Sequence, residues 1–160
     1  MGDEVRRRIA AIPHDGGSWA DIAERGLYSL LTPSMYKKVM RGDLGSYPDV
    51  YGRMAWNRPA PTIKRECRHV GNGRYAHPEQ DRSLTLREIS ILQGFPRDFR
   101  FDLDSANSYR HVGDAVPPLI SYQLSALVTW MKTGVRPLAR DWILPGSSLT
   151  LDDLVVIEES

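Results

Sequence analysis

The sequence predicts an α+β fold, in which a small irregular domain of short strands and loops around one or two helices is followed by a projecting helix. Three observations support this prediction. A helix with both ends encoded lies near the middle, extended segments precede it, and a strongly apolar helix follows it. The expected divisions are a small domain at 1–110, a segment with the last helix at 111–134, and a tail at 135–160.

The central helix follows a polar, proline-containing loop that starts at His77. Thr85 and Glu88 have the spacing of a capping box, in which each side chain bonds a free backbone N–H at the helix start. Gly94 is expected to end the helix and Pro96 to prevent its continuation. One apolar stripe at helical spacing would face the core, formed by Leu86, Ile89 and Leu92.

Shorter elements are expected before this helix. A helical pattern runs from Asp3 until Pro13 stops it, Ser18 can cap a helix over Trp19–Glu24, and another short helix is expected over Ser34–Met40. Tyr51–Trp56 alternates weakly enough to predict a strand. Pro59 and Pro61 limit the next segment to a short extended piece over Thr62–Ile63.

After the central helix, residues 99–114 are charged and predicted to form a loop. Pro118 then opens a helix over Leu119–Lys132, which Gly134 and Pro137 close. This helix carries more large apolar side chains than a small domain should leave uncovered, namely Leu119, Ile120, Leu124, Leu127, Val128 and Met131.

Composition favours a soluble cytoplasmic protein, with 41% hydrophobic residues. No apolar run approaches the roughly 20 residues that span a bilayer, and no apolar signal segment follows the basic cluster at Arg6–Arg8. The single cysteine, Cys67, excludes an internal disulfide framework and a cysteine-rich zinc site. We therefore expect neither a membrane partner nor a bound metal.

Charge is unevenly distributed although the net charge is only +1. Residues 35–74 hold nine Lys or Arg against three acids, whereas residues 135–160 hold two against five. A basic middle with an acidic tail suggests a polyanionic partner for the middle, and a solvated surface is the alternative.

Two motifs carry a resemblance to DNA cytosine-5 methyltransferases. The central helix resembles the family's ninth sequence block through Arg82, Leu84, Thr85, Arg87, Glu88, Gln93, Gly94, Phe95 and Pro96. The tenth block, Gly-Asn-Ala-Val-Pro-Pro in the family, matches Gly113–Pro118 with Asp114 in place of the asparagine. The resemblance implies that residues before the ninth block belong to the target-recognition region. It also implies that the last helix packs on a Rossmann-like cofactor domain, which these 160 residues do not include.

The implied reaction transfers a methyl group from S-adenosylmethionine to carbon-5 of a cytosine flipped out of double-stranded DNA. The family performs it with a Pro-Cys, a Glu-Asn-Val and a Phe-x-Gly-x-Gly, and none of these occurs here. Cys67 is expected to be a bystander with no catalytic role, although its cationic neighbours would lower the pKa of its thiol. This chain alone should therefore be inactive.

The chain thus resembles the target-recognition and pocket-completing part of such an enzyme, as a subunit or as a fragment. It would act with a polypeptide that carries the missing blocks, or self-associate through its last helix. The alternative is a non-catalytic DNA-binding module derived from such an enzyme. The resemblance implies that Asp114, Ala115 and Val116 line the amino-acid end of the cofactor pocket, where a carboxylate would repel the cofactor's carboxylate but accept from its ammonium.

DNA contacts are expected from the basic middle and its glycine-containing loop. The candidate residues are Arg53, Lys64, Arg65, Arg68, Asn72, Gly73 and Arg74. For Arg74 the alternative is an ion pair with Glu79, Asp81 or Asp102. A structural role is expected for Arg82, Arg87 and Glu88.

Overall fold

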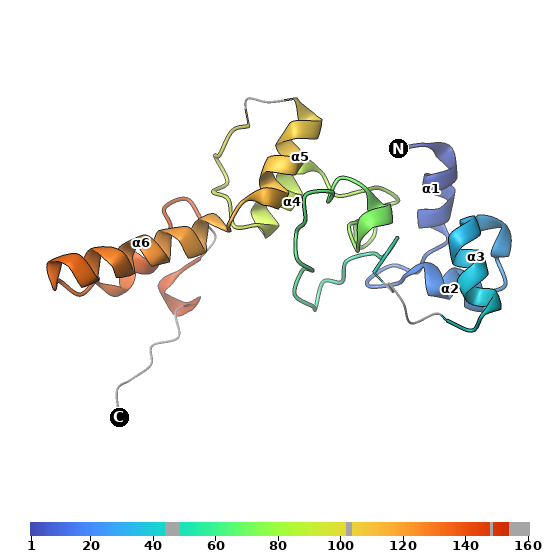
Figure 1. Cartoon of the computed structure of the whole chain (residues 1–160), viewed down its shortest axis with the longest axis horizontal. Helices are drawn as coiled ribbons and strands as arrows, with labels where there is room; N and C mark the ends of the chain where they lie inside the picture. Colours follow the sequence, from blue (N-terminus) through green and yellow to red (C-terminus); the bar gives the residue numbers. More distant parts are fainter. Residues whose placement is uncertain (44–48, 102–103, 148, 154–160) are drawn as a thin grey trace.

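The computed structural model describes residues 1–43, 49–101, 104–147 and 149–153, apart from the side chain of Ser105. Its α-helices are α1 (Asp3–Ala10), α2 (Trp19–Glu24), α3 (Pro33–Met40), α4 (Leu86–Leu92), α5 (Ser105–Asp114) and α6 (Pro118–Thr133). Short 3-10 turns lie at η1 (Tyr28–Leu30), η2 (Val70–Asn72), η3 (Ala139–Trp142) and η4 (Leu151–Asp153). Helices α1 to α3 form one end of an elongated molecule, α4 and α5 lie near its middle, and α6 projects from the other end (Figure 1). None of the helices in the described ranges has the length and apolar character needed to cross a membrane.

The α+β prediction is wrong, because the described residues are helical and form no sheet. The expected strand over Tyr51–Trp56 is reduced to a single parallel bridge from Arg53 to Ala76, which also bridges Ser83. Turns interrupt the pairing on both sides, and Tyr51 itself has a positive φ of 54°. The piece around Ile63 forms no bridge either, since the neighbouring prolines have no N–H to donate.

The predicted helices are confirmed, but the apolar stripe expected to face the core from α4 is only partly right, since Ile89 is buried and Leu92 is 44% exposed. In α4 the Thr85 hydroxyl accepts from the Glu88 N–H at 3.2 Å, while the Glu88 carboxylate accepts from the Thr85 N–H at 2.7 Å. Ser18 caps α2 in the same way, with Asp21 as its partner. Helix α6 opens on Pro118 and ends at Gly134, whose φ of 70° is left-handed.

The loop predicted for residues 99–114 is wrong over its second half, where α5 forms. The Asp104 carboxylate caps this helix by accepting from the N–H groups of Ala106 and Asn107, at 2.9 and 3.0 Å. The helix packs on α4, and the Tyr109 hydroxyl donates to the Leu84 carbonyl at 2.9 Å. Its apolar stripe is short, so its periodicity is a weak signal in the sequence, but an aspartate directly before a helix start is a cap signal.

The core consists of separate clusters of buried side chains. One surrounds α4 and α5 and contains Met54, Ile63, Cys67, Tyr75, Leu84, Ile89 and Val112. A second holds α2 and α3 together through Ile12, Trp19, Ile22, Ala23, Leu31 and Met35. A small cluster of Ile9, Val70 and Ala76 lies at α1. All of these clusters lie before α6.

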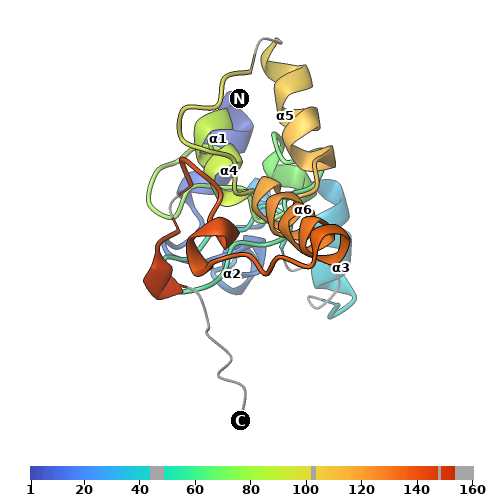
Figure 2. The same ribbon diagram turned by 90° about the vertical axis from the view of Figure 1, so that its left-hand side faces the viewer.

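Helix α6 has two different faces and buries none of its 16 residues fully. One face is half-buried and comprises Leu119, Tyr122, Gln123, Ala126 and Trp130. Turn η3 lies on this side, where Gln123 Nε2 donates to the Trp142 carbonyl at 3.2 Å (Figure 2). The other face is exposed by 38–78% and comprises Ile120, Leu124, Leu127, Val128 and Met131. The exposed residues follow a 3.6-residue period, so they form one continuous apolar stripe, here called the α6 stripe.

A structural role for Arg82 and Glu88 leads to a prediction about acid stability. The Arg82 guanidinium donates to both Glu88 carboxylate oxygens at 2.7 Å, and this pairing is the main cause that lowers the pKa of Glu88 from 4.5 to about 2. A lowered pKa means that ionised Glu88 stabilises the fold fully above about pH 4.5 and progressively less as the pH falls towards 2. Glu88→Gln should therefore flatten the loss of unfolding free energy in that window, as measured by urea unfolding.

Arg82→Gln should flatten the same window, because it removes the other half of the pair. If the unfolding free energy of both variants falls between pH 4.5 and 2 as steeply as that of the wild type, the pair has no stabilising role.

Candidate nucleic-acid interface

The basic segment 64–74 turns around Cys67, whose side chain is fully buried in the core. Its thiol donates to the Tyr109 carbonyl at 3.6 Å, and its N–H donates to the Lys64 carbonyl at 2.9 Å. Because Cys67 points inward, Lys64, Arg65 and Arg68 are left exposed on the outside of the turn. Among the described residues, neither Lys64 nor Arg68 forms an ion pair, which leaves both cations available to a ligand.

Burial, rather than the cationic neighbours, decides the acidity of Cys67. It raises the pKa of the thiol to about 11, so the expectation of a lowered pKa is wrong. A thiol that stays protonated inside the core is no nucleophile at neutral pH. The bystander role expected for Cys67 agrees with this environment.

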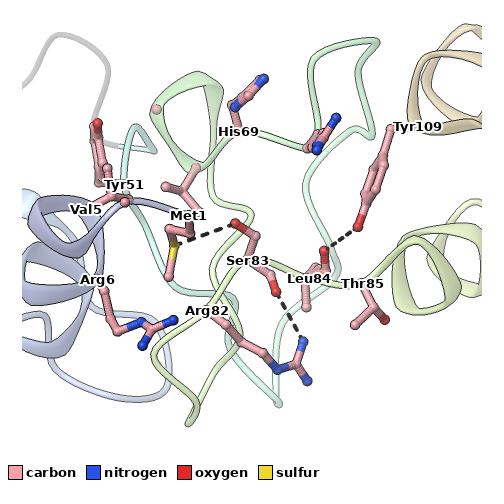
Figure 3. A pocket seen from close by; sticks show the side chains of 14 residues that line it. Met1, Val5, Arg6, Tyr51, His69, Arg82, Ser83, Leu84, Thr85 and Tyr109 are labelled. Carbon is pink, nitrogen blue, oxygen red and sulfur yellow. Dashed lines mark hydrogen bonds between the residues drawn. The ribbon is translucent and has the colours of Figure 1, made fainter. Parts of the chain in front are cut away.

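An open groove of about 610 Å³ runs between α1 and the basic segment. Figure 3 shows Met1 in the middle of this groove beside Ser83, with Tyr109 bonded to the Leu84 carbonyl. Arg6 from α1 and Arg68 from the basic segment both line it. Sequence reasoning missed Arg6, although its position in a run of three arginines was the available signal. A third arginine of the groove, Arg82, is paired with Glu88, so Arg6 and Arg68 are the lining cations that favour a polyanion there.

Arg53 lies inside the protein and not on this surface, since its side chain is fully buried. Its guanidinium donates to the carbonyl oxygens of Ile9, Ile12, His77 and Gln80 at 2.8–3.1 Å, and it pairs with Asp81. All of its donor nitrogens are thus used within the fold.

Arg74 is also engaged, with a partner other than Glu79 or Asp81, and the third acid weighed from the sequence, Asp102, lies outside the described residues. Its Nη1 donates to the carbonyls of Gly16, Gly17 and Arg53 at 2.6–3.2 Å, and its Nε pairs with Asp49 at 3.1 Å. Nearby, Asn72 is exposed at the end of η2. Gly73 packs so closely on Tyr75 that an added Cβ would lie 2.5 Å from its ring.

The residues expected at the cofactor pocket lie where α5 ends and α6 begins. Asp114 is the last residue of α5, and Val116 is 62% exposed. Gln93 Nε2, at the end of α4, donates to the Ala115 carbonyl at 2.8 Å, which ties the two sequence blocks together. The Asp114 carboxylate pairs with Arg65 at 3.1 Å, so the basic segment reaches the same place.

Comparison with known proteins shows which family the chain belongs to. Residues 14–127 match the family model for C-5 cytosine-specific DNA methylases. The chain belongs to this family. The match includes the basic segment, both sequence blocks and the first part of α6.

Individual relatives show how little of a whole family member is present. The chain is similar to the type II methylase M.HgiDII of Herpetosiphon aurantiacus, at 43% identity over 117 residues, which are 71% of this chain and 30% of that relative. DNA (cytosine-5)-methyltransferase 3 of Arabidopsis thaliana is 31% identical over 116 residues, 68% of this chain and 8% of that protein. The type II methyltransferase M.AquIB of Picosynechococcus sp. is 37% identical over 95 residues, 52% of this chain and 66% of that relative. No solved structure matches the chain.

The placement of Arg53 predicts a stability defect. Arg53→Met keeps the length of the side chain but leaves four carbonyls without their donor, so it should reduce the free energy of unfolding by about 3–5 kcal/mol. The measurement is urea unfolding followed by circular dichroism.

Arg87→Met is the matched control, because Arg87 is exposed on α4 and the change should stay within about 0.5 kcal/mol. Equal stabilities of the two variants would contradict the account of Arg53.

Proposed function

We propose that the chain is the target-recognition and pocket-completing part of an S-adenosylmethionine-dependent DNA cytosine-5 methyltransferase. The cysteine nucleophile and the glycine-rich cofactor loop would lie on a second polypeptide. The observation that carries this proposal is the α6 stripe, which is apolar, regular and uncovered by any described segment.

The energetics of the α6 stripe favour a protein partner. Full burial of one such side chain contributes roughly 1.5–3 kcal/mol of favourable free energy. Five exposed side chains therefore provide a large driving force for association with another protein surface. The described part of the tail, residues 135–147 and 149–153, does not provide the cover, because η3 contacts the neighbouring half-buried face of α6. A cofactor-binding domain on a second polypeptide would cover the stripe and bring its own pocket beside Asp114–Val116.

The residues at the α5–α6 junction suit one end of a cofactor pocket. Ala115 is small, Val116 presents an exposed apolar side chain, and Asp114 is a carboxylate able to accept from an ammonium group. The bound cofactor would supply the methyl group, while this chain would hold its amino-acid end.

DNA contact by this chain would come from the exposed cations. Lys64, Arg65 and Arg68 are exposed on the basic segment, Arg6 and Arg68 line the same groove, and Asn72 is exposed in the same segment. Arg53 and Arg74 would support this surface from within, since their guanidinium groups hold backbone carbonyls. Gly73 would allow the loop to turn closely against Tyr75.

The relative from Picosynechococcus supports a division between two chains. Its 95 matched residues make up 66% of it, so a chain named as a type II methyltransferase is itself short. A stand-alone DNA-binding module would also use the exposed cations, but it gives no reason for an uncovered α6 stripe.

The test introduces charge into the α6 stripe. Leu127→Asp with Met131→Asp should leave circular dichroism and thermal unfolding nearly unchanged, because both side chains are exposed. The same variant should abolish binding to a complementing polypeptide, measured by sedimentation velocity. A suitable probe is the Herpetosiphon relative deleted for its matched region.

Ser125→Asp with Thr129→Asp is the matched control, since it adds the same charges on the polar side of the same helix. Binding should survive in that variant. Global unfolding of the Leu127/Met131 variant would place α6 in this chain's own core and overturn the proposal. If the wild-type chain self-associates and the Leu127/Met131 variant does not, the partner of the α6 stripe is a second copy of this chain and not a second polypeptide.

A further inference from the structure

The two segments assigned to DNA and to the cofactor touch each other at one point. Arg65 Nη1 donates to Asp114 Oδ2 at 3.1 Å, and the two side chains remain 56% and 47% exposed. Arg65 belongs to the basic segment, whereas Asp114 is the last residue of α5, just before the link to α6. A ligand can therefore reach either partner without any rearrangement of the core.

The backbones at this point are packed closely. A Cβ on Gly113 would lie 2.2 Å from the Lys64 carbonyl oxygen and 2.5 Å from the Arg65 N. Such a distance leaves no space for a side chain, so the basic turn rests directly on the last turn of α5. The ion pair is thus held in register by its backbone, and only the two side chains are free to exchange partners.

A cation beside Asp114 is electrostatically favourable. It is the C-terminal residue of α5, where the helix dipole disfavours negative charge. It also occupies the position at which the family motif has an uncharged asparagine. Arg65 supplies the cation in the free chain.

We propose that Arg65 is shared between Asp114 and a DNA phosphate, so that the charge at the α5–α6 junction controls how strongly the basic turn holds DNA. This inference rests on the proposed function, because it assumes that the basic turn binds DNA. When DNA binds, a phosphate competes with Asp114 for the guanidinium. A cation that takes over Asp114, such as an ammonium group in the cofactor pocket, releases Arg65 to the phosphate. By linkage, DNA that takes Arg65 leaves Asp114 open to such an ammonium group.

The exchange is energetically accessible because exposed ion pairs are weak. Neutralising Asp114 should strengthen DNA binding by about two- to five-fold, which corresponds to the usual range for an exposed pair. Arg65→Ala should weaken binding and lower the slope of log K against log salt by about one unit, as expected for one lost phosphate contact.

The test is a double-mutant cycle on the purified chain. The probe is a fluorescent duplex of mixed sequence, and binding is followed by anisotropy at several salt concentrations. Asp114→Asn reproduces the neutralised junction and should raise affinity two- to five-fold. In the Arg65→Ala background the same substitution should have only the small general effect of removing one negative charge.

Glu66→Gln is the matched control, because Glu66 is exposed in the same turn and its removal changes the charge by the same amount. Its effect on affinity should be equal with and without Arg65. Equal effects of Asp114→Asn in both backgrounds, or an unchanged salt slope in Arg65→Ala, would overturn the shared role while leaving the proposed function intact. A wild-type chain that binds no DNA at low salt would overturn both.

Discussion

The buried guanidinium of Arg53 is the interaction on which this fold depends most. The described region has no strand ladder, so many loop carbonyls need a donor that regular secondary structure would normally supply. Arg53 donates to carbonyls at the end of α1, at Ile9 and Ile12, and in the loop before α4, at His77 and Gln80. One side chain thereby joins the α1–α3 end to the α4–α5 region. Its charge is balanced at the surface by Asp81.

The candidate surfaces follow from this internal support. With the loops held from within by Arg53 and Arg74, and with Cys67 buried, the remaining cations of the basic segment face outward. The packing of α4 on α5 then brings the end of α5 against the same segment. The α5–α6 junction therefore lies next to the candidate DNA surface, and α6 extends away with an apolar stripe that none of the described residues covers.

Features that depend on local chemistry could be predicted from the sequence. The capping boxes at Thr85 and Ser18, the proline at the start of α6 and its excess of apolar side chains act within a few residues of each other. The family also follows from local motifs. The strand over Tyr51–Trp56 was predicted wrongly because strand formation needs a partner of sufficient length, and here the pairing stops after one bridge.

Features that depend on distant partners could not be predicted. The sequence around Arg53 does not reveal that four carbonyl groups from two other segments surround its guanidinium. Its positive charge alone therefore suggested a contact with DNA. For the same reason the charge pattern did not reveal that Arg65 pairs with Asp114, 49 residues away. Helix α5 could have been predicted from the sequence, because Asp104 is a recognisable helix cap. It was missed because the helix has only a weak apolar pattern.

The central claim is that this chain supplies only part of a methyltransferase. The most direct measurement is transfer of a radiolabelled methyl group from S-adenosylmethionine to duplex DNA by the purified chain, since its one thiol is buried and held protonated. The account predicts no incorporation by the chain alone. Methylation of cytosine by the chain alone, lost in Cys67→Ser, would contradict it.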